Sequence, residues 1–289
     1  MIKGRIAPTP SGLLHLGNAY SFLFTFLLIN KHQGVLRLRI DDHDGLRTKQ
    51  PFIDDLFYAL DWLGIYWQLG PQNASEAFAH SQGQRMEIYQ HYIELLKNDG
   101  RLFACTCSRK SIGDYPNYPG VCIDKQLPLN DDCNWRLLPT TTTALFFDHF
   151  TQKQVSLPLD HNLTHPVIKR KDGLPAYQLI SLIDDVDYGI NCIVRGEDLL
   201  ASTCFQLFLS HQLQLESFNH VKFYHHPLLV DEQGNKLSKS AGSFSLTDFR
   251  QRHTIIELYR GFATWIGITN AKEIITLNDL MHCFNALDY

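Results

Sequence analysis

The chain has 289 residues, of which 44% are hydrophobic, and its formal net charge at pH 7 is −4. This length and apolar content allow a substantial buried core in one large domain or two modest ones. The small negative charge argues against a protein that coats nucleic acid, although local basic clusters can still bind phosphate.

The sequence also lacks the patterns of exported and membrane proteins. No stretch has the length and apolarity of a membrane span, and residues 1–6 run directly into a strand pattern without a secretion signal. Seven cysteines are an odd number, which argues against a disulfide framework and favours reduced thiols or a metal site. We therefore expect a cytoplasmic protein.

The first part of the chain alternates between strand and helix patterns. We expect a short strand at residues 4–7, a buried helix at 18–30, an alternating strand at 35–40 and a helix at 51–63. This order predicts an α/β fold with a Rossmann-type parallel sheet and right-handed crossovers.

The middle of the chain differs in composition. A helix is expected at 80–98, and the following segment is rich in Cys, Pro, Thr and Asn, which indicates an inserted subdomain. Beyond it, buried-strand patterns cover 179–185 and 192–196, and helical patterns cover 203–213 and 247–266. The predicted parts are a first half of the catalytic domain (1–100), the insertion (101–165), a second half (166–245) and a short helical C-terminal region (246–289).

The motif His15-Leu16-Gly17-Asn18 follows the first strand and opens the first helix. The positive end of a helix dipole and its free N–H groups favour phosphate at such a place. There, His15 can donate a hydrogen bond to a phosphate in the transition state, and Gly17 leaves room for an adenine ring. Asn18 could cap the helix or touch the nucleotide.

A second motif, Lys236-Leu237-Ser238-Lys239-Ser240, lies in a glycine-flanked loop near the other end of the chain. Its two lysines can neutralise the β- and γ-phosphates of ATP as pyrophosphate leaves, and its serines add donors. Either motif alone is also consistent with an ordinary helix start or a solvated turn. Together they favour an ATP site in which His15, Lys236 and Lys239 are catalytic and Gly17, Asn18 and Ser238 also bind the nucleotide.

With these motifs, the chain resembles a class I aminoacyl-tRNA synthetase of the glutamyl/glutaminyl branch. The resemblance covers residues 4 to 240. Its supporting motifs are Arg5-Ile6-Ala7-Pro8-Thr9-Pro10-Ser11-Gly12, Arg39-Ile40-Asp41-Asp42-His43-Asp44, Arg195-Gly196-Glu197-Asp198 and the final Lys-Leu-Ser-Lys-Ser. It implies that ATP, carrying Mg²⁺, activates an amino acid as its adenylate.

The resemblance also implies a set of residues for the amino acid. Arg5 and Arg195 are expected to bind the side-chain carboxylate of glutamate, because a guanidinium can hold a carboxylate bidentately. The other implied glutamate-binding residues are Ala7, Thr9, Asp41 and Tyr177. Asp41 stands where glutamate-specific relatives usually have Glu, which departs from the family pattern. As alternatives, Arg195 could pair with Glu197 or Asp198, and Tyr177 could be a core aromatic residue.

The acceptor is expected to be RNA. Only residues 241–289 follow Ser240, whereas full glutamyl-tRNA synthetases carry a large anticodon-binding region there. The short form resembles the glutamyl-queuosine tRNA(Asp) synthetase family, which implies transfer of glutamate to the queuosine base at the wobble position of tRNA(Asp). The anticodon loop would then enter the active site of a monomer. Alternatives are a truncated ligase that charges a tRNA 3′ end, a non-catalytic RNA-binding paralogue, and a nucleotidyltransferase acting on a small phosphate ester.

Cys105, Cys107 and Cys122 form a candidate zinc site. Thiolates are strong zinc ligands, and a structural zinc is normally four-coordinate. The Cys-x-Cys pair followed by Tyr118-x-x-x-Cys122 matches the zinc pattern of the queuosine enzymes, which implies one structural Zn²⁺ per chain with Tyr118 as the fourth ligand. Tyr115 and Cys133 are competing ligands, and buried or free thiols are the alternative to a metal site.

The acidic run at residues 41–44 also resembles a metal site. We favour substrate binding and helix capping for it, because it ends a strand at the ligand-binding edge of the predicted sheet.

Overall fold

The computed structural model describes residues 1–43, 48–108, 118, 120–138, 143–158, 165–230 and 245–289. These residues form two compact units. The first comprises Met1–Ser81, Cys192–Glu197 and Phe223–Tyr289, and the second comprises Gln82–Asn191 and Asp198–Lys222. The division of the sequence into four parts stays a prediction.

A mostly parallel sheet forms the centre of the first unit. Its strands are β1 (Lys3–Ile6), β2 (Val35–Leu38), β8 (Cys192–Gly196) and β9 (Lys222–His226), in the order β2-β1-β8-β9. β1 pairs in parallel with both β2 and β8. The α/β fold with a parallel sheet, predicted from the alternation of strand and helix patterns, is confirmed.

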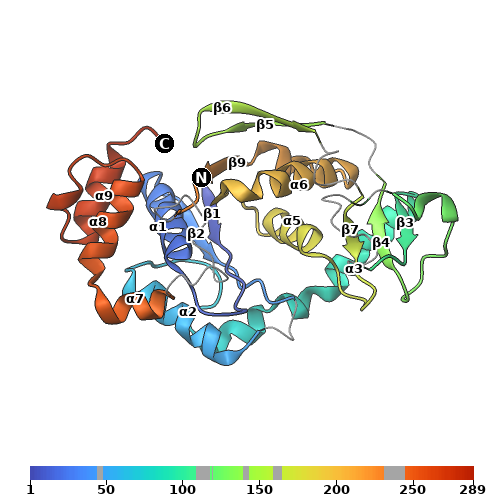
Figure 1. Ribbon diagram of the computed structural model, residues 1–289, viewed down its shortest axis with the longest axis horizontal. Coiled ribbons are helices and arrows are strands. Elements are labelled where there is room, and N and C mark those ends of the chain that lie inside the picture. The colour runs from blue at the N-terminus through green and yellow to red at the C-terminus, as the bar shows by residue number, and fades with distance from the viewer. Residues whose placement is uncertain (44–47, 109–117, 119, 139–142, 159–164, 231–244) are drawn as a thin grey trace. The chain divides into compact units, whose positions relative to one another are not determined.

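Helix α1 (Leu16–Lys31) connects β1 to β2 and is buried along most of its length. Its apolar and aromatic residues pack against β1, β2 and β8 (Figure 1). A side chain at Gly4 would bring its Cβ within 2.6 Å of Ile29 Cδ1, so the glycine allows α1 to approach β1 closely. Each fully buried Phe or Leu on this helix contributes about 2 kcal/mol of transfer free energy.

Further helices belong to the first unit. They are α2 (Gln50–Trp62), η1 (Ala74–His80), α7 (Leu246–Arg252), α8 (Ile255–Trp265), η7 (Ala271–Glu273) and α9 (Leu277–Asn285). Figure 1 shows α7, α8 and α9 in orange and red on the same side as α1 and α2. Arg250 on α7 donates to Asp55 on α2 at 2.6 Å, so a largely buried ion pair joins these two helices.

The single helix predicted at 247–266 is wrong, because the chain forms α7 and α8 with a break at His253. His253 adopts an extended backbone after α7. Thr254 then caps α8, accepting from the backbone N–H of Glu257 while the Glu257 carboxylate accepts from the backbone N–H of Thr254. This capping box begins a new helix where the apolar pattern alone continues the old one.

Helices and two antiparallel β arrangements make up the second unit. The helical elements are η2 (Gln82–Arg85), α3 (Met86–Asn98), η3 (Ile123–Lys125), α5 (Tyr177–Asp187), η4 (Glu197–Leu199), α6 (Leu200–Gln212) and η5 (Glu216–His220). The strands are β3 (Leu102–Cys105), β4 (Asn134–Leu137), β5 (Thr143–Asp148), β6 (Lys153–Pro158) and β7 (Val167–Lys169). β3-β4-β7 form one antiparallel sheet, and β5 and β6 form a hairpin.

The strand predicted at 179–185 is wrong, because these residues lie in helix α5. All seven are buried, including Ser181, Asp184 and Asp185, so polar residues do not mark an exposed face that would distinguish a helix from a strand. The fully buried Asp184 carboxylate accepts hydrogen bonds from Gln82, Arg85 and Tyr89, at 2.7–2.9 Å. These bonds tie α5 to η2 and α3. The α-helix predicted from His80 likewise begins later, at Met86.

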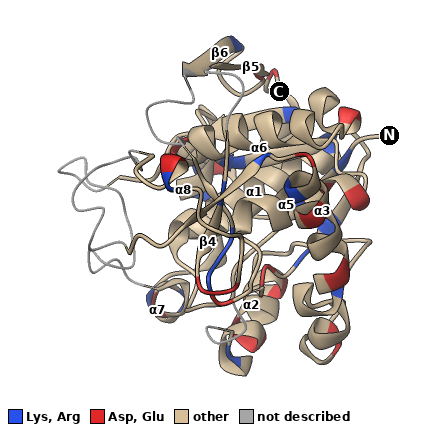
Figure 2. Ribbon diagram, turned by 90° about the vertical axis from the view of Figure 1, so that its right-hand side faces the viewer, with Lys and Arg blue, Asp and Glu red and all other residues tan. Residues whose placement is uncertain are grey.

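Among the described residues, no helix combines the length and the apolar character that crossing a membrane requires. Acidic and basic residues are interspersed over the described ribbon (Figure 2). This distribution fits the small net charge of the sequence.

Candidate active site

His15 is the N-cap of α1, at the end of the helix where backbone N–H groups are exposed. Its Nδ1 accepts from the backbone N–H of Asn18 at 3.3 Å, and the Asn18 side-chain oxygen accepts from the backbone N–H of His15 at 3.0 Å. Because Nδ1 is an acceptor, the proton of the neutral ring sits on Nε2. The cap thus orients an N–H donor at the positive end of α1. Asn18, predicted as a possible cap, is the N3 residue of this capping box, in which His15 is the N-cap.

Gly17 keeps the space beside this imidazole clear. A Cβ at residue 17 would lie 3.0 Å from both Cε1 and Nδ1 of His15. A side chain there would therefore push the His15 ring out of its capping position. The glycine protects the orientation of His15, in addition to the room that the sequence predicts for adenine.

Ser245 lies beside His15 although 230 positions separate them in the sequence. The two residues form an isolated antiparallel bridge, and the Leu246 N–H donates to the Leu14 carbonyl at 2.7 Å. Lys236, Ser238 and Lys239 lie outside the described residues, in the segment 231–244 that directly precedes Ser245. Ser245, the first described residue after that segment, is thus held at the N-terminus of α1.

Arg5 and Arg195 lie on one face of the sheet. Gly4 pairs with Cys192, and Gly4 faces α1. Because side chains alternate between the two faces of a strand, Arg5 and Arg195 both point to the opposite face, away from α1. Both guanidinium-bearing residues are buried, and Arg5 donates to the Val194 carbonyl at 3.4 Å. The sheet therefore brings together the two cations that the sequence predicts for a carboxylate.

Sequence reasoning missed a third arginine on this face. Arg37 on β2 is the direct register partner of Arg5, so the two side chains leave neighbouring strands on the same side. The signal was available, because Val35-Leu36-Arg37-Leu38-Arg39 alternates apolar and basic residues. The face of β2, β1 and β8 opposite α1 is consequently rich in positive charge, which suits an anionic ligand.

Asp41 is fixed by Arg39, an interaction that the sequence analysis did not foresee. Arg39 Nε and Nη2 donate to the two Asp41 carboxylate oxygens at 2.6 and 3.0 Å, and both side chains are buried. This bidentate pair sets the direction of the carboxylate. It uses two of the roughly four acceptor positions of the carboxylate.

The remaining predicted glutamate-binding residues belong to both units. Ala7 is half-buried directly after β1, and Thr9 is exposed. Tyr177 is the first residue of α5 in the second unit, where it is partly buried. Its position relative to Arg5 and Arg195 stays a prediction.

Cys105, Cys107 and Cys122 come together in the second unit. Their sulfur atoms all lie within 4.8 Å of one another, and those of Cys107 and Cys122 are 3.6 Å apart. Ligands about 2.3 Å from a tetrahedral zinc have sulfur atoms about 3.8 Å apart. The three thiols therefore fit one tetrahedral ion. The Tyr118 hydroxyl is buried beside them and accepts from the Cys122 backbone N–H at 2.9 Å.

The cluster also shifts the acidity of its members. Burial raises the pKa of Tyr118, and hydrogen bonds with Cys105 and Cys122 raise it further. Burial also opposes ionisation of Cys122, but hydrogen bonds from Tyr118 and the Thr106 backbone outweigh it and lower the pKa of Cys122 to about 7. A thiolate is thus accessible near neutral pH, which a metal ligand requires.

The two competing ligands fall elsewhere. Cys133 is buried with its sulfur 3.3 Å from the Asn130 carbonyl, outside the group of three thiols. Tyr115 lies outside the described residues.

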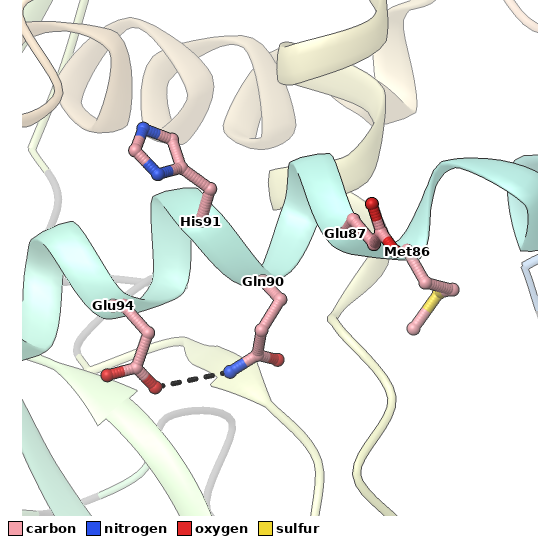
Figure 3. Close-up of a pocket in the computed structure, with 5 residues that line it drawn as sticks. All are labelled: Met86, Glu87, Gln90, His91 and Glu94. Carbon is pink, nitrogen blue, oxygen red and sulfur yellow. Dashed lines mark hydrogen bonds between the residues drawn. The ribbon is translucent and has the colours of Figure 1, made fainter.

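A depression of about 560 Å³ lies along α3 and is lined by Met86, Glu87, Gln90, His91 and Glu94. Figure 3 shows all five on one helix, with His91 pointing away from the hydrogen-bonded pair Gln90 and Glu94. None of the predicted site residues lines it.

Comparisons with known proteins identify a matching family and several relatives. A family model described as tRNA synthetases class I (E and Q), catalytic domain, matches residues 1–117 and 136–287. A glutamate–tRNA ligase of Lawsonia intracellularis is 29% identical, over 97% of this chain and 60% of its own length. Glutamate–tRNA ligase 2 of Syntrophus aciditrophicus is 31% identical, over 97% of this chain and 61% of its own. The chain thus spans about 60% of the length of the curated relatives that it matches.

Solved structures share the fold. A glutamate–tRNA synthetase from Elizabethkingia anophelis superposes with a TM-score of 0.76 at 20% identity, covering 97% of this chain and 65% of that one. A glutamate–tRNA ligase from Elizabethkingia meningosepticum, described as in complex with its amino acid, gives a TM-score of 0.74 at 19% identity, with 97% and 64% coverage.

Proposed function

Because the chain belongs to the class I tRNA synthetases of the glutamate and glutamine branch, through their catalytic domain, we propose that it activates glutamate with ATP and transfers it to RNA. The observation that carries this proposal is the N-terminus of α1, where His15 is held as a hydrogen-bond donor and Ser245 is anchored beside it. The chemistry is formation of glutamyl-adenylate, followed by formation of an ester.

In the first step, an oxygen of the α-carboxylate of glutamate attacks the α-phosphorus of ATP. The bond from that phosphorus to the bridging oxygen breaks, and its electron pair leaves with pyrophosphate. His15 Nε2–H stabilises the charge that develops on the phosphate, and Lys236 and Lys239 neutralise the leaving group. Gly17, Asn18 and Ser238 complete the nucleotide contacts. Mg²⁺ arrives bound to the phosphates of ATP.

For glutamate, we propose that Arg5 and Arg195 bind the side-chain carboxylate, with Arg37 adding to the positive potential of the same sheet face. Asp41, directed by Arg39, receives the ammonium group, and Tyr177, Ala7 and Thr9 line the rest of the pocket. The bidentate Arg39–Asp41 pair supports this role, since it fixes the direction of a side chain one methylene shorter than Glu. A guanidinium rejects the neutral amide of glutamine, because it needs acceptors on both atoms that it faces.

A structural Zn²⁺ is proposed for Cys105, Cys107, Cys122 and Tyr118. Their donor set suits zinc, and the closeness of the three sulfur atoms supports the assignment. When bound, zinc would hold together by coordination the segments that carry these residues. Within the chain itself, the Cys122 N–H to Tyr118 hydrogen bond already fixes part of this arrangement.

As acceptor, we propose the queuosine base at the wobble position of tRNA(Asp). A hydroxyl oxygen of queuosine attacks the carbonyl carbon of the adenylate, AMP leaves with the bonding pair, and the hydroxyl proton passes to the AMP phosphate or to solvent. The arrangement of the cysteines and Tyr118 supports this acceptor, because their spacing resembles the queuosine enzymes. The names of the relatives favour a second candidate, the 3′ end of a tRNA.

Two measurements test the proposal. Pyrophosphate exchange into ATP, run without tRNA, is expected with glutamate and to be far weaker with glutamine or aspartate. Its absence with all three excludes adenylation and favours a non-catalytic RNA-binding protein. Labelled glutamate is then transferred to tRNA and the labelled nucleotide is mapped before and after mild alkaline hydrolysis. Label at the wobble base supports queuosine, whereas label at the terminal adenosine supports ordinary charging.

A further inference from the structure

His226, the last residue of β9, is buried although none of the proposed chemistry uses it. Only 5% of the residue is exposed, and its ring packs edge-on against Trp265 at 5.2 Å and Phe24 at 6.4 Å between centroids. A polar ring in such surroundings is costly unless its nitrogens are hydrogen-bonded. Both nitrogens have partners: Nδ1 lies 2.9 Å from the Pro227 carbonyl oxygen and Nε2 lies 3.0 Å from Ser21 Oγ.

These partners determine the tautomer of the ring. A carbonyl oxygen can only accept, so Nδ1 carries the proton and donates to Pro227. In the neutral ring Nε2 is then the acceptor, and the Ser21 hydroxyl donates to it. The hydrogen bond between Ser21 and His226 therefore has one defined direction, from helix α1 to the end of strand β9.

Ser21 lies on the same helix that His15 caps. It is six residues after His15, a rise of about 9 Å along the helix axis. Most buried residues of α1 are apolar, and its side-chain hydrogen bonds to other segments also come from Asn30 and Lys31 at its C-terminal end. A hydrogen bond is directional and weakens steeply with misalignment. The Ser21–His226 bond is thus a directional contact in the N-terminal half of α1, the half that His15 caps.

We infer that His226 is a positioning residue for adenylation: through Ser21 it sets the rotation and register of α1 on the sheet, and with them the direction of His15. This inference rests on the proposed function. It assigns His226 no contact with the substrate, since the residue acts only through the helix.

The test removes the bond from either side. Ser21→Ala removes the donor, and His226→Asn keeps a donor for Pro227 but is too short to reach Ser21. We expect each variant to lower the turnover number of glutamate-dependent pyrophosphate exchange about tenfold, with little change in the KM for glutamate. The double variant should lose no more than either single one, because both remove the same bond. His226→Gln, whose side-chain oxygen can accept from Ser21, should recover most of the turnover.

Thr25→Val is the matched control. The Thr25 hydroxyl lies on the same helix and is buried, but it donates to the Ser21 carbonyl within α1 at 2.7 Å. Its loss should leave turnover per active site unchanged. If His226→Asn does not fold, Ser21→Ala decides, because it removes one hydroxyl from a half-buried position.

The outcomes are distinguishable. If the unaltered protein catalyses exchange, and Ser21→Ala and His226→Asn lower only the melting temperature, the positioning role is wrong and the proposed function still stands. No exchange by the unaltered protein overturns both. A tenfold loss of turnover that Gln restores at position 226 supports the positioning role, since a merely structural contact would not separate turnover from KM.

Discussion

The sheet around α1 and the cysteine cluster place their polar groups by different means. In the first region, strand register and a helix cap fix the directions of Arg5, Arg195 and His15. In the second, Cys107 and Tyr118 lie outside strands and helices, and contacts among the cluster's own side chains hold them. Regular structure positions the first set before any ligand binds, whereas the second set would gain rigidity from the metal proposed for it.

This difference predicts that substitutions near α1 change catalysis with little effect on folding. His15→Asn is the sharpest case, because Asn is a good N-cap but lacks the imidazole donor. We expect glutamate-dependent pyrophosphate exchange to fall about 100-fold while the melting temperature stays nearly constant. His15→Ala, which loses both donor and cap, should also lower the melting temperature. Equal activity in His15→Asn and the unaltered protein would remove His15 from the chemistry.

Substitutions of the arginines on the sheet face opposite α1 should lower activity less, and the loss should depend on which amino acid is the substrate. Arg195→Gln is expected to lower kcat/KM for glutamate about 30-fold and to narrow the preference for glutamate over glutamine. Arg195→Lys keeps the charge but not the bidentate geometry, so its loss should be intermediate. An unchanged preference in Arg195→Gln would assign the discrimination to another residue.

In the cysteine cluster, by contrast, a substitution should change metal content first. Cys105→Ser is expected to lower zinc, measured by elemental analysis, well below one equivalent, and to make the protein more sensitive to proteolysis. Cys133→Ser is the matched control, because that thiol lies apart from the three clustered ones. Equal zinc in both variants would exclude Cys105 as a ligand and would reduce the contrast between the two regions.

The smallest expected effect measures how much a helix cap alone contributes to the free energy of unfolding. Thr254→Ala removes the capping side chain of α8 and should cost about 1 kcal/mol, measured by urea unfolding. Thr264→Ala on the same helix removes an exposed hydroxyl without a capping role and should cost less. An unchanged free energy of unfolding in Thr254→Ala would argue against a stabilising contribution from the His15 cap as well.

The sequence predicted best what neighbouring residues determine. The His15 motif predicted a helix start, and the spacing of Cys105 and Cys107 predicted their proximity. The strand at 179–185 failed because a run buried on all sides has no periodic face. The helix break at His253 was missed because the capping box of Thr254 that follows it lies inside an otherwise helical pattern. Arg37 was overlooked because the register that sets it beside Arg5 pairs residues distant in sequence.

The register of Arg5 with Arg37 has a further consequence for the protein without substrate. Neighbouring strands are about 4.8 Å apart, so these two like charges leave the sheet close together and repel each other. An anion seated between them relieves that repulsion. By mass action, the melting temperature of the first unit should therefore rise with the concentration of any anionic ligand that binds at this face.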